Sequence, residues 1–322
     1  MTDLEQMHPR TARYLASYRK LSRTRTPREI QYPPRLPRVQ DTIDLHCHAD
    51  EGQQDALALA KYASQNGMAG ILFKNIVGRQ RPGESVRQVR EELNRWCEQE
   101  QLRPVDCWAG FNVTDSGTTP WLDAVGEQLD AGVRGIWMPV FASACTISKI
   151  RGIPFADALE IGVYLLDDKG QLKPEVRDII RLVADRGATL SFAHASHPEL
   201  YAMAEEVGKI GFEHAFVYHP FSPFVDLSVE EMRWFANEGI YLNFTFDEIS
   251  PIRGVDPFEM YEAIRAIGVE RVTLSSDAGE PIFPNSVESM RLMCTYMAAM
   301  GLSDEEVRRV SVENPAAVMA GT

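Results

Sequence analysis

The chain has 322 residues, of which 44% are hydrophobic, 9% aromatic and 25% charged, and its formal net charge is −13. This composition is typical of a globular protein with a large core, and it excludes disordered, collagen-like and disulfide-stapled small proteins. The acidic balance argues against nucleic-acid binding, because phosphates require clustered Lys and Arg. Five scattered cysteines, no uncharged apolar run near about 18 residues and no secretory signal predict a cytoplasmic protein with no membrane attachment.

Residues 1–40 differ from the rest of the chain in charge, with nine Lys or Arg against three Asp or Glu. Apolar side chains at helical spacing predict a helix over roughly Pro9–Arg23, followed by an extended Pro-rich stretch. We interpret this region as a basic N-terminal helical arm that precedes a body over residues 41–322. The arm either packs on its own acidic body or reaches over a partner subunit, and the second alternative favours a homo-oligomer, a dimer or larger.

From Asp41 onward, short apolar runs alternate with longer amphipathic stretches. The candidate strands are Thr42–His46, Ala69–Lys74, Val105–Asn112, Gly135–Val140, Thr189–His194, Ala215–His219, Gly239–Thr245 and Arg271–Ser276. The candidate helices are Asp55–Asn66, Ser85–Glu98, Trp121–Ala131, Pro174–Arg186, Pro198–Val207, Ser228–Asn237, Pro257–Ala266, Val287–Met300 and Asp304–Arg309. Strands that are apolar through most of their length and alternate with helices favour a parallel sheet covered on the outside.

Eight such units predict an α/β fold, a (β/α)8 TIM barrel. A doubly wound open sheet is the alternative, but no glycine-rich phosphate-binding loop follows any candidate strand. The stretch Phe141–Asp168 is longer than a usual loop, and we expect it to cover the mouth of the barrel.

Four of the seven histidines and one aspartate fall at or just beyond the ends of candidate strands. They are His46 and His48 after the first strand, His194 after the fifth, His219 after the sixth and Asp277 after the eighth. The carboxyl ends of parallel strands share one face of a barrel, where barrel enzymes place their sites. Any single histidine here is better explained as a hydrogen-bonded packing residue than as a ligand, but the joint pattern is hard to obtain by accident. The set predicts a site for Zn2+ or a similar divalent metal.

The order of these residues resembles the amidohydrolase superfamily of metal-dependent hydrolases, over roughly Thr42 to Met319. The ending Val312–Ala316 is also similar to the opening of that superfamily's C-terminal helix. The residues most similar to one branch of uncharacterised predicted metal-dependent hydrolases are Ile43–His48, Ile71–Asn75, Ile136–Pro139, Ala193–Ser196, His219–Pro220 and Ser275–Gly279. The resemblance implies an amidohydrolase-like barrel and hydrolytic chemistry with one or two metal ions, and it implies no substrate.

One departure from the superfamily concerns a lysine. Its binuclear members commonly carry a carboxylated lysine at the end of strand four, whereas Gly135–Pro139 offers no such ligand here. The lysine at a strand end is Lys74, after the second strand. It is either a carbamylated metal ligand, an ammonium that binds an anionic substrate or polarises a carbonyl, or a solvated lysine. A charged lysine beside a divalent cation is repelled, so near a metal it loses its proton or is modified.

The predicted reaction is hydrolysis of an amide, cyclic amide or lactone or ester bond of a small molecule by metal-activated water. Asp277 would bind the metal or lie beside it and carry the proton of the water, with His219 and Lys74 as further catalytic candidates. Arg79, Arg81 and Asn75 are the candidates for binding substrate, and a solvated basic loop is the alternative for the two arginines. Other polar residues that follow strands near the mouth are Asn112, Asn243, Asp247, Glu248 and Glu280.

Three alternatives stay open. A phosphoesterase on a related barrel is favoured by the early histidine pair and by the Arg79 and Arg81 loop. A single-metal decarboxylase or hydratase fits the same superfamily. A catalytically inactive binding barrel is the alternative from a different class, and the intact ligand set argues against it.

Overall fold

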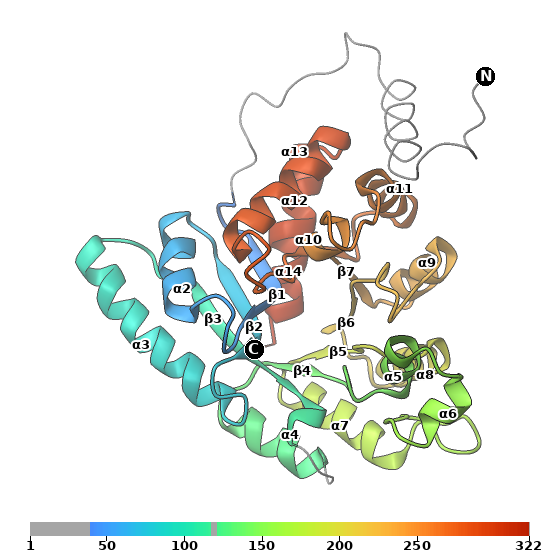
Figure 1. Ribbon diagram of the computed structural model, residues 1–322. Helices are drawn as coiled ribbons and strands as arrows, with labels where there is room; N and C mark the ends of the chain where they lie inside the picture. Colours follow the sequence, from blue (N-terminus) through green and yellow to red (C-terminus); the bar gives the residue numbers. More distant parts are fainter. Residues whose placement is uncertain (1–38, 117–120, 322) are drawn as a thin grey trace, which may run out of the picture. The chain divides into compact units, whose positions relative to one another are not determined.

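The computed structural model describes residues 39–116 and 121–321. The basic arm predicted over residues 1–40 lies, up to residue 38, outside the described residues, so its helix and its partner stay predictions. In the described part of the chain, strands and helices alternate in sequence (Figure 1).

The strands are β1 (Ile43–Ala49), β2 (Gly70–Ile76), β3 (Asp106–Asn112), β4 (Gly135–Trp137), β5 (Thr189–Ser191), β6 (Ala215–Tyr218), β7 (Tyr241–Thr245) and β8 (Val272–Ser275). The longer helices are α2 (Ala56–Gln65), α3 (Pro82–Glu100), α4 (Trp121–Asp130), α7 (Pro174–Asp185), α8 (His197–Ile210), α9 (Val229–Asn237), α11 (Pro257–Ile267) and α12 (Ser286–Met300). The shorter ones are α5 (Ala144–Arg151), α6 (Phe155–Leu159), α10 (Phe246–Ile249), α13 (Asp304–Arg308) and α14 (Asn314–Met319).

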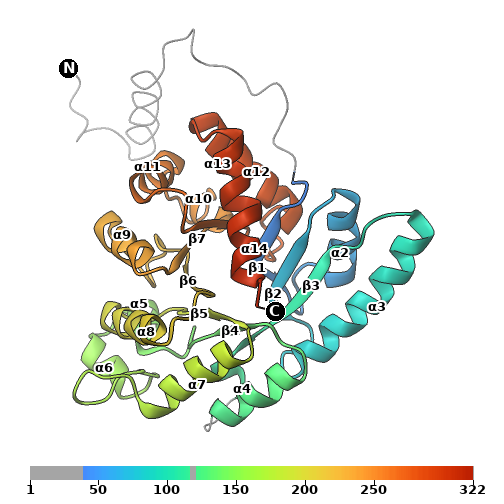
Figure 2. The same cartoon turned by 180° about the vertical axis from the view of Figure 1, so that it is seen from behind.

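Neighbouring strands pair in parallel and in sequence order from β1 to β8. A parallel bridge between Cys47 and Ala278 joins the first strand to the segment after the last. Two backbone hydrogen bonds support this junction, from His48 N to Ala278 O and from Asp277 N to His46 O, both 2.8 Å long. The strands form an inner ring with the longer helices outside it (Figures 1 and 2), so the predicted (β/α)8 TIM barrel is confirmed.

Capping side chains and a proline mark the first turns of several helices. Ser228 caps α9 in a capping box with Glu231, and Ser303 caps α13 in the same way with Glu306, as that sequence spacing indicates. Pro257 lies in the first turn of α11, where its missing N–H costs nothing. Among the described residues, no helix combines the length and the apolar character needed to cross a bilayer.

The strand ends differ from the sequence-based expectation. β1 and β2 run further than expected, to Ala49 and Ile76, because they still pair with each other at these ends, after a register shift near Cys47. The fourth, fifth, sixth and eighth strands end earlier. Their next residues include Ala193 (φ 56°), His219 (φ 37°) and Asp277 (φ 49°), whose left-handed backbone cannot continue a strand.

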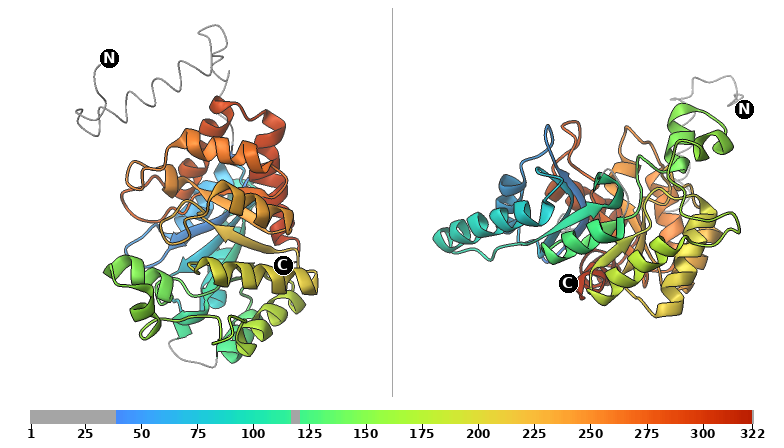
Figure 3. Two further views of the ribbon diagram at one scale, coloured as in Figure 1. Left: turned by 90° about the vertical axis from the view of Figure 1, so that its right-hand side faces the viewer. Right: turned by 90° about the horizontal axis from the view of Figure 1, so that it is seen from below.

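The segment Phe141–Asp168 was expected to be a loop, and it contains the helices α5 and α6 instead. Ser143 caps α5 and accepts a hydrogen bond from Thr146 N, while a parallel bridge to Val163 closes the segment on itself. Figure 3 shows these two green helices outside the ring of strands. The segment contributes Phe141 to the lining of the cavity described below.

Candidate metal centre

Three of the predicted ligands lie together where β1 meets the end of β8. The ligand atoms of His46, His48 and Asp277 are all within 4.8 Å of one another. Oδ1 of Asp277 is 3.1 Å from Nε2 of His46 and 3.0 Å from Nε2 of His48. His46 and Asp277 meet without hydrogen-bond geometry, and neither ring nitrogen of His46 has a hydrogen-bond partner among the described residues. A buried imidazole without a partner is costly, and a cation between the three side chains would satisfy it.

A buried carboxylate beneath this cluster fixes its backbone. Asp44 accepts hydrogen bonds from the N–H of His46 at 3.1 Å and from the N–H of Ser276 at 3.0 Å. Its second oxygen accepts from the hydroxyl groups of Ser276 and Ser286. Burial raises the pKa of Asp44 to about 6, although these hydrogen bonds lower it. Our sequence analysis missed this residue, and the available signal was a charged side chain within an apolar strand.

The other two predicted ligands form a second pair. Nε2 of His194 lies 3.1 Å from Nε2 of His219, and Nδ1 of His194 lies 3.0 Å from the hydroxyl of Thr146 on α5. His219 Nδ1 is buried and has no hydrogen-bond partner in the described part of the chain. The ring centres of His46 and His219 are 6.2 Å apart, so both groups of ligands belong to one site.

The buried ring of Tyr218 lies among these imidazoles. Its centre is 4.6 Å from that of His46, 5.7 Å from that of His194 and 3.8 Å from that of His219. The ammonium of Lys74 donates a hydrogen bond to the Tyr218 hydroxyl at 3.2 Å. Lys74 therefore lies beside the predicted ligands, whereas Tyr218 was not among our candidates.

The protonation states suit a divalent cation. Burial lowers the pKa of His46 and of His194 well below the usual value and lowers that of His219 to about 3, and the Lys74 charge adds to each effect. These three imidazoles are therefore neutral at pH 7 and present lone pairs. Burial alone would raise the pKa of Asp277, but its interactions with His46, His48 and Lys74 outweigh burial and hold that pKa well below its usual range. Neutral imidazoles beside a carboxylate are the ligand chemistry of zinc.

A cavity of about 330 Å³ opens on the two ligand groups. Its lining includes Lys74, and the predicted substrate-binding residues Asn75 and Arg79 also line it. Arg81 does not: it is exposed, and its guanidinium lies 3.4 Å from the carboxylate of Glu84. The structure thus brings two of the three predicted substrate-binding residues to the cavity.

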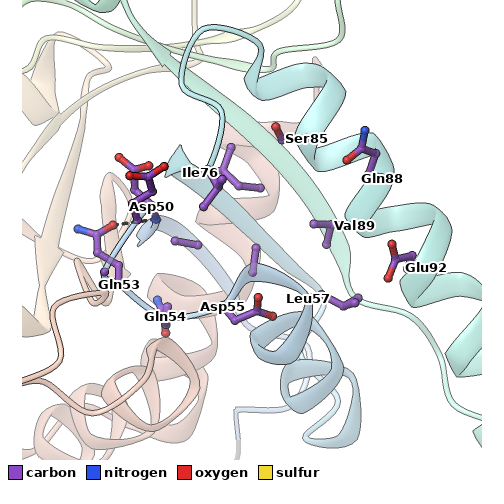
Figure 4. A pocket seen from close by; sticks show the side chains of 15 residues that line it. Asp50, Gln53, Gln54, Asp55, Leu57, Ile76, Ser85, Gln88, Val89 and Glu92 are labelled. Atoms are coloured by element: carbon purple, nitrogen blue, oxygen red, sulfur yellow. Dashed lines mark hydrogen bonds between the residues drawn. The ribbon is translucent and has the colours of Figure 1, made fainter.

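A second cavity, of about 450 Å³, lies beside the first, between the β1–α2 segment, the end of β2 and α3 (Figure 4). Its lining contains none of the predicted metal ligands. Two of its residues nevertheless contact residues that line or lie beside the first cavity. Asp50 pairs with Nε of Arg79, and Gln54 donates hydrogen bonds to the carbonyl groups of His48 (2.9 Å) and Ala278 (3.1 Å).

Residues 41–243 match the sequence model of DUF6282, a family of unknown function. No curated protein sequence matches the chain. Among solved structures, an amidohydrolase from Pseudomonas aeruginosa is similar, with a TM-score of 0.59 and 12% identity, over 88% of this chain and 96% of that one. A dihydroorotase is similar with a TM-score of 0.52 and 16% identity, over 88% and 70%. The probable dipeptidase PvdM from Pseudomonas aeruginosa follows with 0.53 and 12%, over 98% and 100%. At these identities the similarity shows the barrel fold, and the particular branch suggested by the sequence stays a prediction.

Proposed function

Since this chain belongs to DUF6282, a family of unknown function, its activity must be inferred from its own residues, and we propose that it is a metal-dependent hydrolase of small molecules. The observation that carries the proposal is the cluster of His46, His48 and Asp277, whose ligand atoms lie within 4.8 Å of one another at the carboxyl end of the barrel. That two proteins of similar fold are an amidohydrolase and a dihydroorotase supports it.

In this proposal, His46, His48 and Asp277 hold a divalent cation, and zinc fits their nitrogen and oxygen donors best. His194 and His219 either complete the coordination of that ion or hold a second one. A bound cation supplies Lewis acidity, which lowers the pKa of water to about 7 and polarises a carbonyl. Asp277 accepts a proton from the attacking water and returns it to the leaving group. The bond cleaved is that of an amide, a cyclic amide or a lactone or ester.

Lys74 has a separate role in the proposal. A divalent cation nearby would favour loss of its proton, but its hydrogen bond to Tyr218 and its place 4.6 Å from the centre of that electron-rich ring fit an ammonium. As a cation on the cavity wall, it binds a negatively charged group of the substrate. Carbamylation of Lys74 is the alternative, and electron density beyond Nζ in crystals grown with the metal would decide for it.

The test is elemental analysis of purified protein beside two variants. A His46→Ala/His48→Ala variant removes two proposed ligands, and His214→Ala removes a histidine that bonds Ala317 O and does not line the site cavity. We expect one or two equivalents of metal in the wild type and in His214→Ala, and almost none in the double variant. Wild-type protein that stays metal-free after incubation with Zn2+ would refute the proposal. A panel of cyclic amides, lactones and phosphate esters then identifies the reaction.

A further inference from the structure

An aspartate and an arginine beyond β7 form a polar pair on the wall of the site cavity. Asp247 belongs to the short helix α10, and Arg253 follows in the segment before α11. Both residues line the cavity, together with His194, His219 and Asp277. Nε of Arg253 donates a hydrogen bond to Oδ2 of Asp247 at 2.9 Å.

The second carboxylate oxygen of Asp247, Oδ1, has an unusual environment. Asp247 is 7% exposed, and its Oδ1 is buried without a hydrogen-bond partner among the described residues. An unsatisfied buried acceptor is destabilising, and more so when it is charged. In a cavity wall, such an atom is explained by a ligand that donates to it.

The backbone around Asp247 holds it in place. Its N–H donates to the carbonyl of Ser276 at 3.2 Å, beside Asp277. Glu248, the next residue, is buried and accepts hydrogen bonds from Phe221 N (2.8 Å) and Thr245 N (2.9 Å). α10 is thereby tied to β7 and to the segment after β6. Asp247 is a fixed carboxylate next to the metal centre rather than a mobile surface group.

The charges of Asp247 and Arg253 interact with the proposed metal ligands. Burial and the charge of Asp277 raise the pKa of Asp247 to about 6. The charge of Arg253 contributes to the lowered pKa of His194 and of His219. The pair therefore lies within electrostatic reach of both ligand groups.

The hydrogen-bonding groups of Asp247 and Arg253 determine which ligand group fits between them. A carboxylate oxygen only accepts hydrogen bonds, and a guanidinium only donates them. Side by side, they match a planar group in which an N–H and a C=O point the same way. This is the edge of a cis amide, found in cyclic amides, cyclic imides and cyclic ureides. A lactone or an ester offers the carbonyl but no N–H, and a site with an unpaired buried acceptor rejects such analogues strongly.

We propose that Asp247 and Arg253 form a subsite that binds the N–H and C=O edge of a cyclic amide or ureide, and that substrates of this class are preferred to lactones and esters. The inference rests on the proposed function and narrows it to one kind of bond. Asp247 accepts the N–H through Oδ1, and Arg253 donates to the carbonyl while holding Asp247 through Nε.

Hydantoin and 1,3-dimethylhydantoin are suitable probes, because methylation removes both N–H groups and keeps the carbonyls. Binding of each to the metal-loaded protein is measured by calorimetry or ligand-detected NMR at pH 8, and ring opening is followed in parallel. We expect the wild type to bind hydantoin at least tenfold more tightly than the dimethyl compound.

The Asp247→Asn variant tests the acceptor. Because Arg253 can only donate, the amide oxygen of Asn turns toward it, and the NH2 group takes the place of Oδ1. Two donors then face each other, so the preference for hydantoin disappears while binding of the dimethyl probe persists and reports a folded cavity. Arg253→Met weakens binding of both probes about tenfold. The matched control is Asp130→Asn, which changes an exposed aspartate paired with Arg186 on the outside of the barrel and leaves both affinities unchanged.

The outcomes separate this inference from the proposed function. Wild-type protein that binds both probes equally, or neither, overturns the subsite. Opening of δ-valerolactone without any preference for hydantoin also overturns the subsite but leaves the hydrolase standing. Preferential binding of hydantoin that Asp247→Asn abolishes, without turnover of any cyclic amide by metal-loaded protein, supports the subsite and refutes the hydrolase.

Discussion

Replacing Asp44 separates the effect of its buried charge on stability from the effect of its hydrogen bonds. Its pKa of about 6 exceeds the value of 3.8 for an exposed aspartate, a difference that corresponds to about 3 kcal/mol. Because the folded chain binds this proton more tightly than the unfolded chain, the stabilisation is fully present below pH 3.8 and is lost as the pH rises through 6. Asp44→Asn does not titrate. The wild type should therefore lose about 2.5 kcal/mol relative to this variant between pH 4 and pH 7.

Urea denaturation of both proteins at several pH values measures this difference and cancels the titration of all other groups. A second variant, Asp44→Ala, tests the hydrogen bonds instead of the charge. In Asp44→Asn, the amide oxygen still accepts from the N–H groups of His46 and Ser276, and the serine hydroxyls can reverse to accept from its NH2. Alanine leaves both N–H groups buried and unpaired, at a cost of about 1–3 kcal/mol each. A pH-independent difference between wild type and Asp44→Asn would refute the reasoning, as would equal stability of the two variants.

Three further predictions concern the surroundings of the site. Thr146→Val removes the hydrogen bond to His194 Nδ1 and should weaken the affinity for metal about 10–100-fold, measured by competition with a chelator. Gly279→Ala should also lower metal affinity and the melting temperature, because its Cβ would lie 2.5 Å from the Cβ of His48. An unchanged metal affinity would show that the backbone around residue 279 shifts without moving His48. Burial raises the pKa of Glu248 from 4.5 to about 8, so the stability that its proton provides should fall as the pH rises from 4.5 through 8, and a Glu248→Gln variant should lack this fall in urea denaturation.

The barrel and its ligand face could be predicted from the sequence because both follow from local patterns. Apolar runs that alternate with amphipathic stretches predict parallel strands, and parallel strands bring their carboxyl ends to one face. His46 and Asp277 are 231 positions apart, yet each follows from its place relative to one strand. The contact between them needs no knowledge of side-chain packing, only the closure of the ring.

The partners of these ligands could not be predicted in this way. Thr146 bonds His194 from a helix in the segment that we expected to be a loop. Asp44 accepts hydrogen bonds from Ser276 and Ser286 only because closure of the barrel places the end of β8 beside β1. Such contacts depend on side-chain direction across the closed barrel, which hydrophobic periodicity does not encode.

Backbone conformation explains why the predicted strand ends differ from the observed ones. Ala193, His219 and Asp277 have positive φ values although none is a glycine, and each ends or follows a strand that the sequence extended too far. A left-handed backbone costs a residue of this kind of order 1 kcal/mol and persists only where the surroundings impose it. Here the surroundings include the hydrogen bonds from Asp277 N to His46 O (2.8 Å) and from His219 N to Asn243 O (2.7 Å). These bonds hold Asp277 and His219 beside the neighbouring strands, while their positive φ turns the chain out of its own strand, which is why the strand ends are hardest to predict at the site itself.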